Sequence, residues 1–195
     1  MSAYDLSVDT QAIEQLMATL PRRLRERAMS RGINRAIRRG RVDVNRAVRS
    51  RVSLKVRDVN RGLTVRRAGR GENSGGIRIE GRPVPLKRFR ARQVQTGVSV
   101  QVMGSRRVVA GAFIANTIGG HVFRRRGPAR LPIDRLHGPS LRSQAEAVMD
   151  ELKPELRQRY MSEMRDAVQF EIRRASGEIQ QTRSVVRWRG QRVAI

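Results

Sequence analysis

The sequence contains no cysteine and few histidine or aromatic residues. Its 195 residues include two His, one Trp, two Tyr and four Phe. Without cysteine there are no disulfides, thiolate metal sites or cysteine nucleophiles, and two histidines leave little material for a metal site. We therefore expect a chain that binds neither a metal nor another cofactor.

Long apolar runs are absent as well. No segment approaches the ~20 consecutive apolar residues of a membrane-spanning helix, so an integral membrane protein is excluded. The first residues lack a basic segment followed by an apolar core, so we expect no signal peptide. A hydrophobic fraction of 38% still suffices for a modest core, and the length fits one domain.

Acidic residues are few. The chain has 42 Lys plus Arg against 17 Asp plus Glu, for a formal net charge of +25. Only Lys55, Lys87 and Lys153 are lysines. A GC-rich genome produces such a bias, and so does a need for Arg, which binds phosphates and carboxylates bidentately. Because this charge opposes compaction unless an anion neutralises it, we expect a polyanionic partner: nucleic acid, acidic lipid or an acidic protein surface.

The charge is unevenly distributed. Residues 1–133 hold 30 basic and 8 acidic side chains, and no acidic residue lies between Gly81 and Ile133. Residues 134–178, by contrast, hold 8 basic and 9 acidic side chains. We expect this nearly neutral segment to pack against protein, either within the protomer or between subunits.

Apolar residues recur at spacings of three and four in two regions, as they do in amphipathic helices. The first region predicts helices within residues 8–63. Pro21 suits the first turn of a second helix, and Gly40 interrupts the apolar stripe of that helix. Gly62 predicts the end of a short third helix, for which Ser53 is a candidate cap.

Residues 64–133 alternate between apolar and polar in short stretches, which predicts four or five strands. Residues 140–176 again show helical spacing, with a kink or restart at Pro154 and a C-cap at Gly177. Helices, then strands, then helices are typical of an α+β fold. We predict long N-terminal amphipathic helices, a small mostly antiparallel sheet and C-terminal helices packed on it, in one domain over residues 1–177.

Candidate catalytic residues are scarce. His121 precedes an apolar strand and His137 precedes a helix, and a structural or surface role suits both. Asp150 and Glu151 lie on the neutral helix, where charge balance is the simpler account. The glycine-rich segment 69–76 lacks the Lys-Ser/Thr and the helix that follow a phosphate-binding loop, so it predicts a flexible loop. We expect no enzyme activity.

Three Arg clusters lie in the acid-free section. They are candidates to contact DNA phosphates without reading sequence, or to contact the acidic surface of a partner protein. A solvated basic surface is the alternative. The clusters consist of Arg88, Arg90 and Arg92; Arg106 and Arg107; and Arg124, Arg125 and Arg126.

Residues 178–195 predict a basic C-terminal arm, either extended or forming a final strand. Within it, Trp188 lies between Arg187 and Arg189. Burial of the indole ring on a neighbouring subunit would anchor the arm there. Packing of the ring on its own domain is the alternative.

A set of short motifs lies between Arg106 and Ser140. A strand leads into the segment GAFI from Gly111, the segment HVF from His121 is followed by basic residues, and the segment LPI begins at Leu131. Together with the basic amphipathic helix near residues 21–50, these motifs resemble the minor tail protein Z family of tailed bacteriophages, also called tail completion proteins.

The resemblance implies a structural virion protein without catalytic residues. Members of that family act at the head-proximal end of the tail, near the neck, where neighbouring proteins form rings, commonly six-fold, around the DNA channel. It implies assembly in the host cytoplasm, a hexameric ring of this chain, and contacts with tail terminator, tail tube and head-connector proteins. It also implies double-stranded DNA in the channel and no membrane. The matching positions, expected to determine the fold, are Gly111, Phe113, His121, Phe123, Pro132 and Ile133.

Two other classes of protein remain open. A nucleic-acid-binding protein outside any virion predicts tight, salt-sensitive binding of DNA or RNA by the isolated chain. An enzyme, such as a nuclease or a phage lysis factor, predicts turnover, for which the sequence offers no credible catalytic set.

Overall fold

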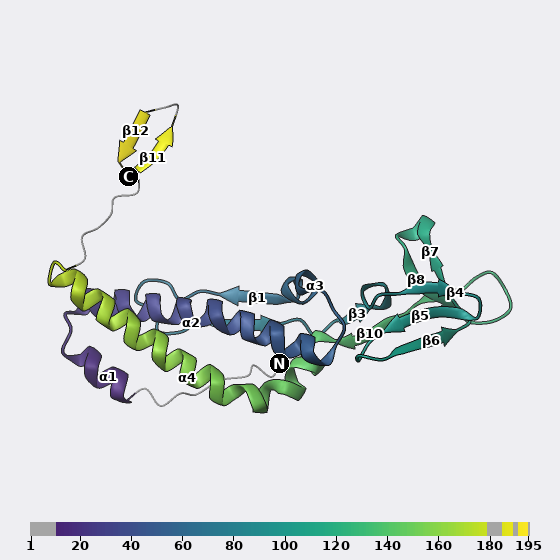
Figure 1. Cartoon of the computed structure of the whole chain (residues 1–195), viewed down its shortest axis with the longest axis horizontal. Helices are drawn as coiled ribbons and strands as arrows, with labels where there is room; N and C mark the ends of the chain where they lie inside the picture. The colour runs from purple at the N-terminus through teal and green to yellow at the C-terminus, as the bar shows by residue number, and fades with distance from the viewer. Residues whose placement is uncertain (1–10, 179–184, 189–190, 195) are drawn as a thin grey trace.

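The computed structural model describes residues 11–178, 185–188 and 191–194. It consists of long helices and small antiparallel sheets, which confirms the predicted α+β class. Figure 1 shows an elongated arrangement, with the long helices in one half and several short strands gathered at the opposite end.

Four α-helices form within the predicted helical regions. They are α1 (Gln11–Ala18), α2 (Arg22–Arg51), α3 (Val56–Arg61) and α4 (Leu141–Ala175). Pro21 directly precedes α2 and Gly62 directly follows α3, as predicted. Helix α2 runs through Gly40, where the apolar stripe is interrupted, and this glycine is itself buried. Ser53 is not the cap of α3: Lys55 occupies the N-cap position, without a side-chain hydrogen bond.

Helix α4 continues through Pro154, so the restart expected there is wrong. Pro154 is exposed, whereas Leu152 is buried and Leu156 packs against the same apolar cluster. Packing on both sides of the proline therefore holds one helix together. Ser140 caps α4 by accepting a hydrogen bond from the Ser143 backbone N–H at 3.1 Å, and Gly177 follows its end with φ +82°.

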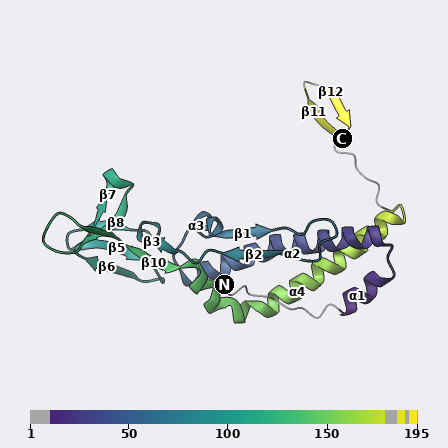
Figure 2. The same cartoon turned by 180° about the vertical axis from the view of Figure 1, so that it is seen from behind.

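Helices α2 and α4 lie side by side and antiparallel (Figures 1 and 2). The predicted C-terminal helices are thus one helix, and its main partner is α2 rather than a sheet. The two helices approach closely at Gly32, where an added Cβ would overlap the Met164 sulfur and lie 3.3 Å from the Ala167 Cβ. Ile33 and Val168 are buried beside this contact.

The strands form five small antiparallel sheets among the described residues, instead of the single sheet that we predicted. The pairs are β1 (Leu63–Arg66) with β2 (Gly76–Ile79), β3 (Pro83–Pro85) with β10 (His137–Ser140), and β11 (Val185–Trp188) with β12 (Gln191–Ala194). The triplets are β4 (Arg92–Val94), β5 (Gly97–Gln101) and β6 (Arg106–Ala110), and β7 (Ala112–Ala115), β8 (His121–Arg125) and β9 (Ile133–Arg135). Two 3-10 turns, η1 (Leu86–Arg88) and η2 (Asn116–Ile118), complete the fold.

The two three-stranded sheets lie in a segment, residues 86–136, that we call the end lobe. The chain enters it from β3 and returns through β10, and these two strands pair with each other. Phe89 is fully buried at this junction, where an added Cβ on Gly138 would lie 2.6 Å from the ring. One apolar cluster runs from Val48 on α2 into Val98 of the end lobe. The end lobe and the helices therefore share a core.

Candidate functional site

Two of the predicted contact arginines are already paired with carboxylates of the same chain. Arg88 forms an ion pair with the nearly buried Asp58 of α3. Arg126 donates to both carboxylate oxygens of Asp134, with Nε to Oδ2 at 2.9 Å and Nη2 to Oδ1 at 2.7 Å. The hydrogen bond from Arg126 lowers the pKa of Asp134. These guanidinium groups are therefore poorly placed to neutralise an outside anion.

Two further arginines of the set bind polar groups on the β4–β5–β6 sheet. Arg90 donates from Nη1 to Gln101 Oε1 at 3.2 Å, and Arg106 donates from Nη1 to Ser99 Oγ at 3.0 Å. Neutral acceptors leave the charge of both guanidinium groups unbalanced, and both residues are exposed.

The remaining members of the three clusters are exposed but spread over two sheets. Arg92 lies on β4, Arg107 on β6 and Arg124 on β8, and none of them forms an ion pair within the described residues. Arg125 lies 5.5 Å above the ring centroid of Phe113. The structure thus leaves exposed arginines on the end lobe without gathering all three clusters at one rim.

The family-motif positions lie inside the end lobe. Gly111, with φ +67°, forms the turn between β6 and β7, where a positive φ favours glycine. Phe113 and Phe123 pair across β7 and β8 with ring centroids 6.2 Å apart, and His121 meets Phe123 edge-on at 6.4 Å. Of the remaining two motif residues, Ile133 begins β9 and Pro132 directly precedes it.

His121 gives a pH-dependent prediction. Desolvation, followed by the charges of Arg135 and Lys87, lowers its pKa from the usual 6.5. We expect an NMR titration of the folded protein to show a midpoint below that of an unstructured His, and Arg135→Gln to raise it. Because the unfolded chain binds the proton more tightly, the stability from neutral His121 is present above pH 6.5 and lost as pH falls through the folded pKa. A midpoint at or above 6.5 would contradict this account.

An ion-pair ladder, which the sequence analysis missed, lies along the α2–α4 interface. Its carboxylates, on Asp43, Glu163 and Glu171, are 93% or more buried by side chain. The contacts are Arg31 Nε to Glu171 at 3.3 Å, Arg35 Nε and Arg39 Nε to Glu163 at 2.9 and 2.8 Å, and Arg159 Nε to Asp43 at 2.6 Å.

The ladder follows from the two helices' antiparallel register. Arg39 of α2 pairs with Glu163 of α4. Four residues later on α2, Asp43 pairs with Arg159, which lies four residues earlier on α4. Neither Glu171 oxygen has a hydrogen bond within the described residues, so its contacts with Arg31 and Arg174 are mainly electrostatic. The sequence does contain a signal for this ladder: Arg recurs every four residues on one predicted helix, and two Glu lie eight residues apart on another.

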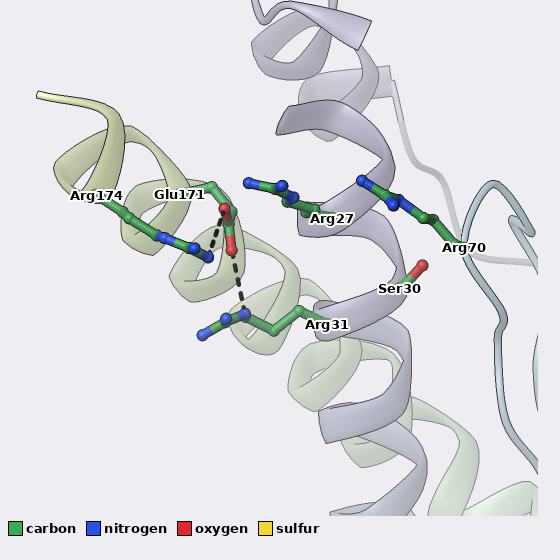
Figure 3. A pocket seen from close by; sticks show the side chains of 6 residues that line it. All are labelled: Arg27, Ser30, Arg31, Arg70, Glu171 and Arg174. Atoms are coloured by element: carbon green, nitrogen blue, oxygen red, sulfur yellow. Dashed lines mark ion pairs between the residues drawn. The ribbon is translucent and has the colours of Figure 1, made fainter. Parts of the chain in front are cut away.

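A hollow opens at the end of this ladder, with a volume of about 350 Å³. We call it the guanidinium hollow (Figure 3). It is lined by Arg27, Ser30 and Arg31 of α2, Arg70 of the β1–β2 loop, and Glu171 and Arg174 of α4. Arg27 and Arg70 form no ion pair with any described residue. None of these lining residues was among the predicted contacts.

A second hollow of about 380 Å³ lies farther along α2, beside β1. Its charged lining residues are Arg38, Arg41 and Arg67. Arg38 Nε donates to the Asn34 carbonyl at 3.3 Å, and Arg41 Nη2 donates to the Asn60 carbonyl at 3.2 Å. No carboxylate lines this hollow.

Other candidate chemistry finds no support in the part of the chain that the structure describes. No group of three or more His, Asp or Glu residues there could hold a metal ion, and no helix there is long and apolar enough to cross a bilayer. In the predicted C-terminal arm, Arg187 and Trp188 belong to β11, but the description does not extend to their side chains, and Arg189 lies outside the described residues.

A comparison with protein families gives a match that covers most of the chain. The model of the family described as prophage minor tail protein Z (GPZ) matches residues 9–177, which include all four α-helices and both three-stranded sheets. No curated protein and no solved structure matches the chain. The family match covers most of the sequence and confirms the resemblance drawn from the motifs in the end lobe. This chain belongs to the prophage minor tail protein Z family.

Proposed function

We propose that this phage minor tail protein completes the tail at its head-proximal end, as a ring around the DNA channel that joins the tail to the head connector. The observation that carries the proposal is the unbalanced positive charge. Ten acidic side chains of the described residues are already in ion pairs with Arg or Lys. The surplus arginines therefore require anions from outside the protomer.

A ring at the neck supplies such anions from two sources. DNA passing through the lumen offers phosphates, and neighbouring subunits offer acidic surfaces. The proposed partners are other copies of this chain in a hexamer, the tail terminator, the tail tube and the head connector, with genomic double-stranded DNA in the channel. The proposed role is structural rather than enzymatic, in a virion neck assembled in the host cytoplasm.

Quantitative mass spectrometry of purified virions and of DNA-free tails tests this role. We expect a few copies per particle, near six or a multiple of six, in both preparations, because protein contacts hold a ring even when DNA is absent. Immunogold labelling should then place the chain at the head-proximal end of the tail. Absence from both preparations would overturn the proposal and favour a nucleic-acid-binding protein outside the virion.

A further inference from the structure

The guanidinium hollow gathers several positive charges in one place. Four arginines and one carboxylate line it, so the lining carries a surplus of three positive charges. Like charges held this close repel one another unless an anion lies between them. The surplus exceeds what a single carboxylate from a partner would neutralise.

Glu171 positions two of the four guanidinium groups. It is fully buried and contacts Arg31 Nε at 3.3 Å and Arg174 Nη1 at 3.8 Å. Arg31 is also held against the ring of Phe170, with its Cζ 3.9 Å from the ring centroid. Each Arg therefore uses one nitrogen on Glu171 and has further N–H donors for a ligand.

The other two guanidinium groups have no carboxylate of their own. Arg27 comes from α2 and Arg70 from the β1–β2 loop, and Figure 3 shows Arg27 extending toward Glu171, with Arg70 on the side of Arg27 away from Glu171. The loop is fastened to α2 directly before Arg70: Ser30 Oγ donates to the Gly69 carbonyl at 2.7 Å, and Asn34 Nδ2 donates to the Ala68 carbonyl at 2.9 Å. These bonds hold the backbone next to Arg70 against α2, so the hollow is built before any ligand arrives.

We propose that the guanidinium hollow binds the phosphate backbone of a nucleic acid. A phosphodiester carries one negative charge, as a carboxylate does, but successive phosphates along a strand bring several charges to the same site, and each offers oxygens that accept charge-assisted, bidentate bonds from Arg. The second hollow, with Arg38, Arg41 and Arg67, continues the basic surface along α2. From Arg27 to Arg38 the helix rises about 16 Å, so a linear polyanion can contact both hollows.

This inference extends the proposed function. It rests on that function only for the identity of the nucleic acid, which would be phage DNA. It also places the strongest phosphate contact on the helices, whereas the sequence pointed to the end lobe. Both locations contain exposed arginines without ion pairs among the described residues, so matched variants can be made at each. A phosphate contact in the hollow and a phosphate contact on the end lobe predict opposite results for these variants.

Binding of a fluorescent duplex of about 20 base pairs to the full chain tests the proposal, as a function of salt. We compare Arg27→Gln/Arg70→Gln in the hollow with Arg107→Gln/Arg124→Gln on the end lobe, since both pairs remove two charges. We expect the hollow variant to bind at least about tenfold more weakly, with a log–log salt slope smaller by about two, and the end-lobe variant to stay within about threefold of the wild type.

Each other outcome overturns the proposal. Equal losses in the two variants would show that net charge alone governs binding, and a loss confined to the end-lobe variant would place the contact there. Circular dichroism and thermal unfolding check that both variants fold. A titration with inorganic phosphate, followed by NMR of the arginine side chains, distinguishes free phosphate from nucleic acid as the ligand. If phosphate saturates Arg27 and Arg70 while the hollow variant binds DNA as the wild type does, free phosphate is the ligand. The virion measurement is independent, so either proposal can fail alone.

Discussion

Replacing Glu163 with alanine is expected to reduce the free energy of unfolding by about 3 kcal/mol, at the lower end of the range for breaking a buried ion pair. The Glu163 side chain is 2% exposed and contacts Arg35 and Arg39. Its removal leaves both cations beside the helix interface without a counter-charge. The cost stays at the low end because Arg35 and Arg39 are 31% and 57% exposed, so their guanidinium groups can turn toward water.

Urea unfolding at neutral pH measures this effect, and Asp150→Ala is its matched control. Asp150 lies on the same helix, pairs with Lys153 at 2.7 Å and is 91% exposed. Its loss removes the same charge and is expected to cost about 0–1 kcal/mol. If the two variants were equally stable, the ladder would contribute no more than a surface ion pair.

Replacing Phe89 with alanine is expected to cost about 3–5 kcal/mol, because it empties the volume of a fully buried ring at the junction of the end lobe and the helices. The cavity would open against Gly138, whose backbone approaches the ring closely and has no side chain to fill the space. Since one apolar cluster crosses this junction, the loss should lower the stability of the lobe and the helices together.

Unfolding followed by far-UV circular dichroism, for the helices, and by NMR signals of the end lobe tests both parts of this prediction. Phe113→Ala is the control, since that ring lies in the same lobe but is only partly buried. It should cost clearly less. A Phe89→Ala variant that loses only the end-lobe signals, while the helices unfold as in the wild type, would contradict a shared core.

The helices could be predicted from the sequence because the apolar residues that recur at helical spacing are the ones that the structure buries. Ala28, Ile33, Ile37 and Val44 all lie on the buried side of α2. Where the prediction failed, tertiary packing outweighed a local signal. Proline disrupts a helix, yet Leu152 before Pro154 is buried and Leu156 after it packs against the same apolar cluster, so α4 does not restart there.

The candidate site was harder to predict, because charge in a sequence does not reveal its partner. Arg88 and Asp58 are 30 residues apart and meet only in the folded chain. The arginines of the guanidinium hollow come from three separate segments, and Arg70 was part of a loop to which we assigned no role. Counting basic residues therefore found the surplus but placed it in the acid-free section.

The pairing of β3 with β10 has a consequence for how the family can vary. The end lobe starts and finishes at adjacent points, since the Leu86 N–H donates to the Leu136 carbonyl at 3.1 Å. A segment with neighbouring ends can be exchanged as a module, because the path of the rest of the chain does not depend on its length. The ring of Phe89 fits against the backbone of Gly138, which lies outside the end lobe. A related protein whose end lobe has another residue in place of Phe89 should therefore also differ at position 138.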